Sequence, residues 1–158
     1  MDKKTIVIYY SNSGTTAQLA QKIGLTFGCE VLSVVPEESY GTYFEAVRRA
    51  GKERKSGEIP AYTAPDLDLA DIDAVFIGYP IWYSAPPAFL LDYVKKLDLR
   101  GKTVIPFSTS GATNIRKTLH ELRTSAGGAA VKCPYNYAML SKDDFSEWAA
   151  SVNRELKR

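Results

Sequence analysis

Short runs of β-branched and other apolar residues alternate with segments of helical periodicity along the whole chain. Three of these runs, at 5–10, 74–78 and 103–107, are almost continuously apolar, as in the central strands of a sheet that is covered on both faces. Strands that alternate with helices indicate a parallel α/β sheet. We therefore predict one doubly wound domain over residues 1–158, with five strands in the sheet.

The remaining elements follow from the same periodicity. We expect further strands at 30–35 and 129–137, and a first helix from Thr16 that ends at Gly28, because glycine commonly terminates helices. A second helix is expected to have one face formed by Tyr43, Phe44, Val47 and Ala50, and a polar face that carries Arg48, Arg49 and Lys52. The other predicted features are a long connection over 55–73, a helix after Pro86-Pro87, a helix with Ile115 and Ala126 on one face, and a last helix after Ser141.

Each of the three apolar runs is followed directly by a short loop of distinct character. The loop at 11–16 is rich in hydroxyls, the loop at 79–83 is aromatic, and the loop at 108–112 has small residues. Parallel α/β sheets bind ligands outside the carboxyl ends of their strands, where the strand order reverses. The three loops are therefore expected to converge on a ligand with a phosphate at one end and a flat ring at the other.

The hydroxyl-rich loop at 11–16 has the features of an anion site. It leads from a strand through Gly14 into a helix, which gathers free backbone N–H groups at a positive dipole end. An ordinary helix N-cap is the alternative interpretation. A dinucleotide site and a P-loop are excluded, because GxGxxG is missing and the Gly101-Lys102-Thr103 segment precedes its strand.

The other two loops are suited to a planar group. Trp82 with Tyr79 and Tyr83 forms a stiff aromatic wall, in which we expect Trp82 to be exposed and to stack on a flat ligand. One of the three aromatic residues is expected to belong to the core instead. Gly111 lets the backbone approach a ring edge closely, although a plain strand-to-helix turn would explain the 108–112 loop equally well.

Composition excludes several classes of function. The net charge is +2 and no basic run exceeds two residues, which argues against a nucleic-acid-binding protein. No apolar stretch is long enough to span a membrane, and the first residues lead into a strand instead of a signal peptide, so we expect a cytoplasmic protein. Cys29 and Cys133 belong to no metal-binding motif, and we expect free thiols and no metal site.

With these loops in this order, the chain resembles the short-chain flavodoxin-like FMN proteins along essentially its whole length. The 11–16 segment resembles the phosphate loop of that family, Ser/Thr-x-Ser/Thr-Gly-x-Thr. The 78–83 segment, Gly-Tyr-Pro-Ile-Trp-Tyr, is similar to the one that flanks the isoalloxazine ring, and 101–111 is similar to the fourth strand and third flavin loop. Thr15 stands where Asn is common, and Ala112 where many relatives have Gly.

The resemblance implies a flavodoxin-like, doubly wound five-stranded parallel sheet of order 2-1-3-4-5, with helices on both faces, FMN as cofactor and electron transfer as chemistry. The flavin carries the redox chemistry, so no catalytic residue is assigned. Ser39, Tyr40 and Tyr43 could border the ring. The expected cofactor-binding residues are Ser11, Asn12, Ser13, Gly14, Thr15, Thr16, Pro80, Ile81, Trp82, Tyr83, Ser108, Thr109, Ser110 and Gly111.

Charge distinguishes the functions that a flavin protein of this kind can have. The sequence pI is about 8.4, and segments 78–88 and 107–115 contain no acidic residue, whereas flavodoxins are usually acidic. Less negative surroundings stabilise an anionic reduced flavin. This favours an oxidoreductase that reduces a small quinone-like acceptor. A one-electron flavodoxin shuttle to a redox protein and a non-catalytic flavodoxin-like binding module are the alternatives.

Overall fold

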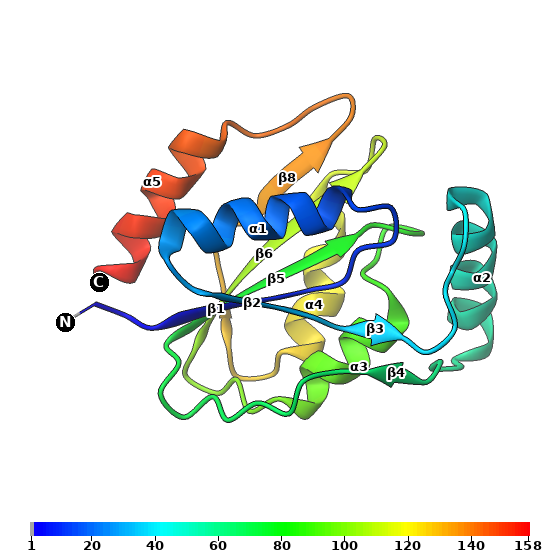
Figure 1. Cartoon of the computed structure of the whole chain (residues 1–158), viewed down its shortest axis with the longest axis horizontal. Coiled ribbons are helices and arrows are strands. Elements are labelled where there is room, and N and C mark those ends of the chain that lie inside the picture. Colours follow the sequence, from blue (N-terminus) through cyan, green and yellow to red (C-terminus); the bar gives the residue numbers. More distant parts are fainter. Residues whose placement is uncertain (1) are drawn as a thin grey trace.

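The computed structural model describes residues 2–158, which form a three-layer α/β arrangement (Figure 1). The parallel central sheet has the order β2-β1-β5-β6-β7, and β8 also pairs with β6. This confirms the predicted parallel sheet and the order 2-1-3-4-5. The strands are β1 (Thr5–Tyr9), β2 (Glu30–Ser33), β5 (Ala74–Pro80), β6 (Thr103–Ser110), β7 (Ala130–Val131) and β8 (Tyr135–Ala138).

The fifth position of the sheet differs from the single strand predicted over 129–137. Two short strands, β7 and β8, occupy it, and both pair with β6. Between them the chain leaves the ladder at Cys133, whose φ of 52° is left-handed. Pro134 follows and has no N–H group to donate, so the ladder cannot continue through it.

The second strand also ends earlier than predicted. β2 ends at Ser33, and the next residues form β3 (Val35–Pro36), which pairs antiparallel with β4 (Tyr62–Thr63). The chain turns away from the sheet after the Val34 N–H donates to the carbonyl of Tyr9. The long connection predicted over 55–73 therefore contains a strand that leads the chain away from the carboxyl end of the sheet.

Helices cover both faces of the sheet. α1 (Thr15–Phe27) and α5 (Phe145–Leu156) pack on one face, around a core that includes Phe76 and Phe107. α3 (Ala88–Lys96), the short 3-10 helix η1 (Ile115–Thr118) and α4 (Leu119–Ser125) pack on the other face, around a core that includes Ile8 and Ile77. No helix within residues 2–158 is both long and apolar enough to cross a membrane.

The helix α2 (Tyr43–Ser56) lies beyond the carboxyl ends of the strands instead of over a face of the sheet (Figure 1). Its buried residues are Ala46 and Glu53, whereas Tyr43 and Phe44 are 62% and 78% exposed. Of the predicted face, Val47 and Ala50 pack against the core, while Tyr43 and Phe44 remain exposed. A helix that does not cover the sheet can fold without a broad apolar stripe. Periodicity alone does not identify the surface against which a helix packs.

Candidate functional site

A cleft of about 500 Å³ opens at the carboxyl end of the sheet and brings the three predicted loops together. The ends of the strands lie side by side here, with Tyr9 paired to Gly78 and Tyr79 paired to Ser108. The predicted residues that line the cleft are Asn12, Ser13, Thr15, Pro80, Ile81, Trp82, Thr109, Ser110 and Gly111.

Residues from two further segments complete the lining of the cleft, and most of these residues were not predicted from the sequence. Gly41 and Thr42 precede α2, while Tyr137 belongs to β8 and Met139 follows it. The Thr-x-x-Glu pattern at 42–45 is typical of a helix start, and it could have placed Thr42 at the cleft. Tyr43, which was expected to border a ring, also lines it.

Three predicted residues of the first loop support the cleft without lining it. The hydroxyl of Ser11 accepts a hydrogen bond from the Gly14 N–H at 3.0 Å, which holds the loop in its turn. The side chain of Thr16 is buried, and its Oγ1 lies 2.7 Å from Oγ1 of Thr109. Thr16 therefore joins α1 to β6, and its hydroxyl already has a partner.

Ser108 and Tyr83 also lie outside the lining. Ser108 is fully buried in β6, and its hydroxyl has no hydrogen-bond partner among the described residues. Tyr83 is 55% exposed and packs against Gly51 of α2. The loops thus converge as predicted, but only part of each loop faces the cleft.

The N-terminus of α1 is left open toward the cleft. The residue that precedes the helix is Gly14, whose φ of 100° is readily adopted only by glycine. No side chain caps this end, and its first turn contains no acidic residue. The first N–H groups of a helix have no partner within it, and they lie at the positive end of its dipole. The ordinary side-chain cap, which was the alternative to an anion site, is absent here.

The aromatic loop is arranged differently from the prediction. Trp82 is only 5% exposed, so the expectation of an exposed tryptophan is wrong. Its ring packs against Tyr10 and Tyr40, with centroids 5.9 and 4.9 Å away, while the residue still lines the cleft. Tyr79 is the core member of the three, and Tyr83 is the exposed one. Trp82 is thus a rigid wall that neighbouring rings hold in place.

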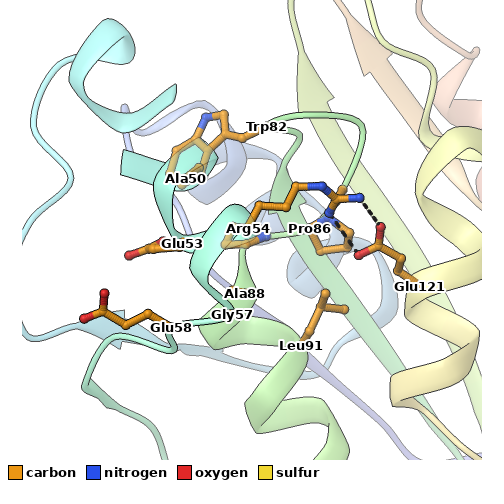
Figure 2. A pocket seen from close by; sticks show the side chains of 12 residues that line it. Ala50, Glu53, Arg54, Gly57, Glu58, Trp82, Pro86, Ala88, Leu91 and Glu121 are labelled. Atoms are coloured by element: carbon orange, nitrogen blue, oxygen red, sulfur yellow. Dashed lines mark hydrogen bonds and ion pairs between the residues drawn. The ribbon is translucent and has the colours of Figure 1, made fainter. Parts of the chain in front are cut away.

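A second cavity, of about 440 Å³, shares Trp82 with the cleft (Figure 2). It lies between α2, the segment 85–88 and α4. Figure 2 shows Arg54 reaching across it to Glu121, with Nη2 and Nη1 donating to the two carboxylate oxygens at 2.6 and 3.2 Å. This bidentate pair ties the end of α2 to α4.

Buried polar contacts hold α2 beside the cleft. The Tyr40 hydroxyl donates to Oε1 of Glu53 at 2.6 Å, and Nε of Arg49 donates to Oε2 at 3.1 Å. The Arg49 guanidinium also lies 4.0 Å from the centroid of the Tyr40 ring. Burial raises the pKa of Tyr40, and the hydrogen bond to Glu53 raises it further. The hydroxyl is therefore a donor at neutral pH. Tyr40 was expected to border a ring, but it supports Trp82 from behind.

The cleft is electrically neutral in its lining. None of the described residues that line it is charged. Its polar end consists of hydroxyls and an amide beside the α1 N-terminus, and its other walls are built by Pro80, Ile81 and Trp82. Such an arrangement can bind an anion through backbone dipoles at one end and enclose a planar apolar group at the other.

The family that matches this chain and three structures to which it is similar are described as flavodoxins or flavoproteins. The model of the family described as Flavodoxin matches residues 4–152. A candidate flavoprotein from Bacteroides eggerthii is 26% identical, with 99% of both chains covered and a TM-score of 0.81. A second, from Bacteroides uniformis, is 27% identical over 97% of this chain and 99% of its own, with a TM-score of 0.75.

A third similar structure is a flavoprotein from Lactobacillus acidophilus in complex with FMN. It is 24% identical, covers 99% of both chains and has a TM-score of 0.75, which at this identity shows a shared fold. No curated protein sequence shows significant similarity to the chain.

Proposed function

The chain belongs to the flavodoxin family, and we propose that it binds FMN and passes electrons to a small, planar, quinone-like acceptor. The observation that carries the proposal is the uncapped N-terminus of α1 at one end of an uncharged cleft. An open helix N-terminus accepts a phosphate without a basic side chain, which is the situation in the 11–16 loop.

The residues at the cleft fit the parts of FMN. Asn12, Ser13 and Thr15 would hold the phosphate together with the first N–H groups of α1, and Ile81 and Trp82 would flank the ring. A volume of about 500 Å³ falls within the range of roughly 300–1,000 Å³ typical of small-molecule sites. When bound, the flavin supplies one- and two-electron chemistry, while the protein supplies binding, orientation and the local field.

The charge of the site supports a small neutral acceptor. The absence of carboxylates among the described lining residues removes a repulsion that would oppose an anionic reduced flavin. An uncharged opening that has Tyr43 and Met139 at its edge is suited to a flat apolar molecule. These features favour direct reduction of a small acceptor over a dedicated low-potential shuttle.

The proposal is tested by titrating the apoprotein with FMN and with riboflavin, using the quenching of flavin fluorescence. We expect FMN to bind at least about 100-fold more tightly, since only FMN can use the α1 N-terminus. The FMN-loaded protein, reduced with dithionite, should then be reoxidised rapidly by 1,4-benzoquinone. Equal affinity for the two flavins would contradict the phosphate site. A protein that binds no flavin would be a binding module, and one that binds FMN but reacts slowly with the quinone would be a shuttle.

A further inference from the structure

The outer face of α2 carries a row of cations that the fold itself does not use. Arg48, Lys52 and Lys55 are exposed, and their spacing of four and three residues places them on one face of the helix. None of the three forms an ion pair with a carboxylate within residues 2–158. The neighbouring Arg49 and Arg54, in contrast, are engaged with Glu53 and Glu121. We call Arg48, Lys52 and Lys55 the α2 basic row.

A strained turn holds an aromatic ring beside the α2 basic row. Tyr83 and Ser84 have φ angles of 54° and 56°, a left-handed conformation that is uncommon for residues other than glycine. The Tyr83 ring lies so close to α2 that a Cβ atom on Gly51 would come within 2.9 Å of it. A glycine within a helix is less favourable than alanine, and here it makes room for the ring. Tyr83 and the row together line one shallow depression.

Exposed apolar side chains lie at or beside the cleft. Tyr43 and Phe44 begin α2, and Met139 and Leu140 follow β8; the last three are 78%, 86% and 83% exposed. Tyr43 and Met139 both line the cleft, and Phe44 and Leu140 are their neighbours in the sequence. Single exposed apolar residues are normal, but a group around a cleft indicates an interaction site. We call these four residues the apolar rim.

We propose that the α2 basic row and the apolar rim form a docking surface for an acidic protein. Three unpaired cations favour an anionic partner. Tyrosine, phenylalanine and methionine beside arginine are the residues enriched in protein–protein interfaces, whereas nucleic-acid binding depends mainly on phosphate contacts. Phe44, which is 78% exposed, lies one turn before Arg48 on the helix. The net charge of the chain is only +2, so a protein partner fits this surface better than a nucleic acid.

The role of this partner follows from the place where it docks. Two residues of the apolar rim, Tyr43 and Met139, line the cleft to which FMN is assigned, so a redox protein held there could exchange electrons with the flavin. This step rests on the proposed function, and the docking itself does not. Two reduced one-electron carriers would each lose one electron. A quinone acceptor would gain these two electrons together with two protons from water, and no other bond would form or break.

The docking surface is tested with an acidic plant-type two-iron ferredoxin as the probe. Binding to the isotope-labelled, FMN-loaded protein would be followed by NMR and calorimetry. We expect shifts at the α2 basic row and the apolar rim, and an affinity that falls at least about tenfold from low to physiological ionic strength, because salt screens exposed charges. Phe44→Ala should weaken binding without changing this salt dependence.

A matched pair of double variants separates the surface from net charge. Lys52→Glu with Lys55→Glu should weaken ferredoxin binding about tenfold or more, because two attractive charges become repulsive. Arg154→Glu with Lys157→Glu makes the same change in charge at the same spacing near the end of α5, at the opposite end of the molecule (Figure 1). This control should change the affinity by less than about twofold.

Three results would overturn the proposal. One is equal weakening by both double variants, and another is an absence of shifts on α2. The third is tighter binding of a short DNA duplex than of ferredoxin, with the same dependence on Lys52 and Lys55. Measuring the apoprotein alongside distinguishes the two proposals. Ferredoxin binding at α2 without FMN uptake would retain the docking surface and reject the flavin function, whereas FMN-dependent quinone reduction without ferredoxin binding would do the reverse.

Discussion

The helices α1 and α2 both begin at the cleft, where the Asn12 side chain donates to the Gly41 carbonyl at 3.2 Å, but their N-termini are capped differently. α1 begins after Gly14 with no capping side chain and no acidic residue in its first turn. α2 begins after Thr42 with a complete capping box, in which Thr42 and Glu45 each bond the backbone N–H of the other. The positive end of α2 is therefore satisfied by its own residues, while that of α1 remains available to a ligand. Under the proposed function, this difference would orient the phosphate of FMN toward α1.

The bodies of the two helices differ as much as their starts. α1 buries Leu19, Ala20 and Ile23 against the sheet, whereas α2 buries Ala46 and Glu53 and is held by polar contacts. Apolar burial over a sheet makes a helix part of the cooperative core, and segments with few buried apolar contacts open at a lower free energy. α1 is thus part of the core with an uncapped N-terminus, whereas α2 is attached to the rest of the molecule mainly by polar contacts.

The largest expected effect comes from giving α1 the acidic first turn that α2 already has. Thr15→Asp should weaken FMN binding by about 2–4 kcal/mol, which is the scale of like charges some 4–8 Å apart at an effective dielectric constant near 20. The same change should stabilise the apoprotein by about 0.3–1 kcal/mol, because a carboxylate complements the helix dipole. Fluorescence titration and urea unfolding measure the two effects.

Riboflavin is the control for this variant, since it lacks the phosphate. Its affinity should be nearly unchanged by Thr15→Asp. If both flavins lost affinity to the same degree, the phosphate would not lie at the start of α1, and the contrast between the two helix starts would have no bearing on binding.

A smaller effect is expected from weakening the attachment of α2. Tyr40→Phe removes the hydroxyl that donates to the buried Glu53, and it should lower the free energy of unfolding by about 1.5–3 kcal/mol, the value for a hydrogen bond to a charged group. Amide exchange should accelerate in α2 more than in α1. Tyr83→Phe removes an exposed hydroxyl and should change stability by less than about 0.5 kcal/mol. Uniform acceleration in both helices would mean that α2 is as much a part of the core as α1.

The contact between Tyr40 and Glu53 can also be tested at alkaline pH in the unmodified protein. Burial raises the pKa of Tyr40 above its value of about 10 in an unfolded chain. The associated stability is therefore fully present below about pH 10, and it is lost as the pH rises further, because only the unfolded state then releases the proton. Urea unfolding above pH 10 should show a shallower decline in Tyr40→Phe than in the unmodified protein.

The smallest expected effect is at the cap of α2. Thr42→Ala should lower the free energy of unfolding by about 1 kcal/mol, as for other N-cap threonines, and should change FMN affinity by less than about threefold, because the Thr42 hydroxyl already serves its own helix. The comparable change Thr26→Ala, at an exposed site within α1, should have little effect on either. A tenfold loss of FMN affinity in Thr42→Ala would instead place this hydroxyl on the ligand.

Much of this arrangement can be predicted from the order of residue types along the chain. The apolar runs at 5–10, 74–78 and 103–107 predict central parallel strands, because only a sheet covered on both faces buries such runs. Chain direction then places the loops that follow them at one edge of the sheet. The missing acidic residues of 78–88 and 107–115 are likewise visible in the sequence, and they account for much of the neutral lining of the cleft.

The tertiary structure alone decided which side chains face the cleft. Periodicity shows that Tyr43 and Phe44 are apolar neighbours, but only the position of α2 beyond the sheet leaves them exposed. Trp82 is buried because Tyr10 and Tyr40, distant in sequence, pack against it. Met139 reaches the cleft through the pairing of β8 with β6. Each of these outcomes depends on contacts between segments far apart in the chain, and a local pattern carries no information about such contacts.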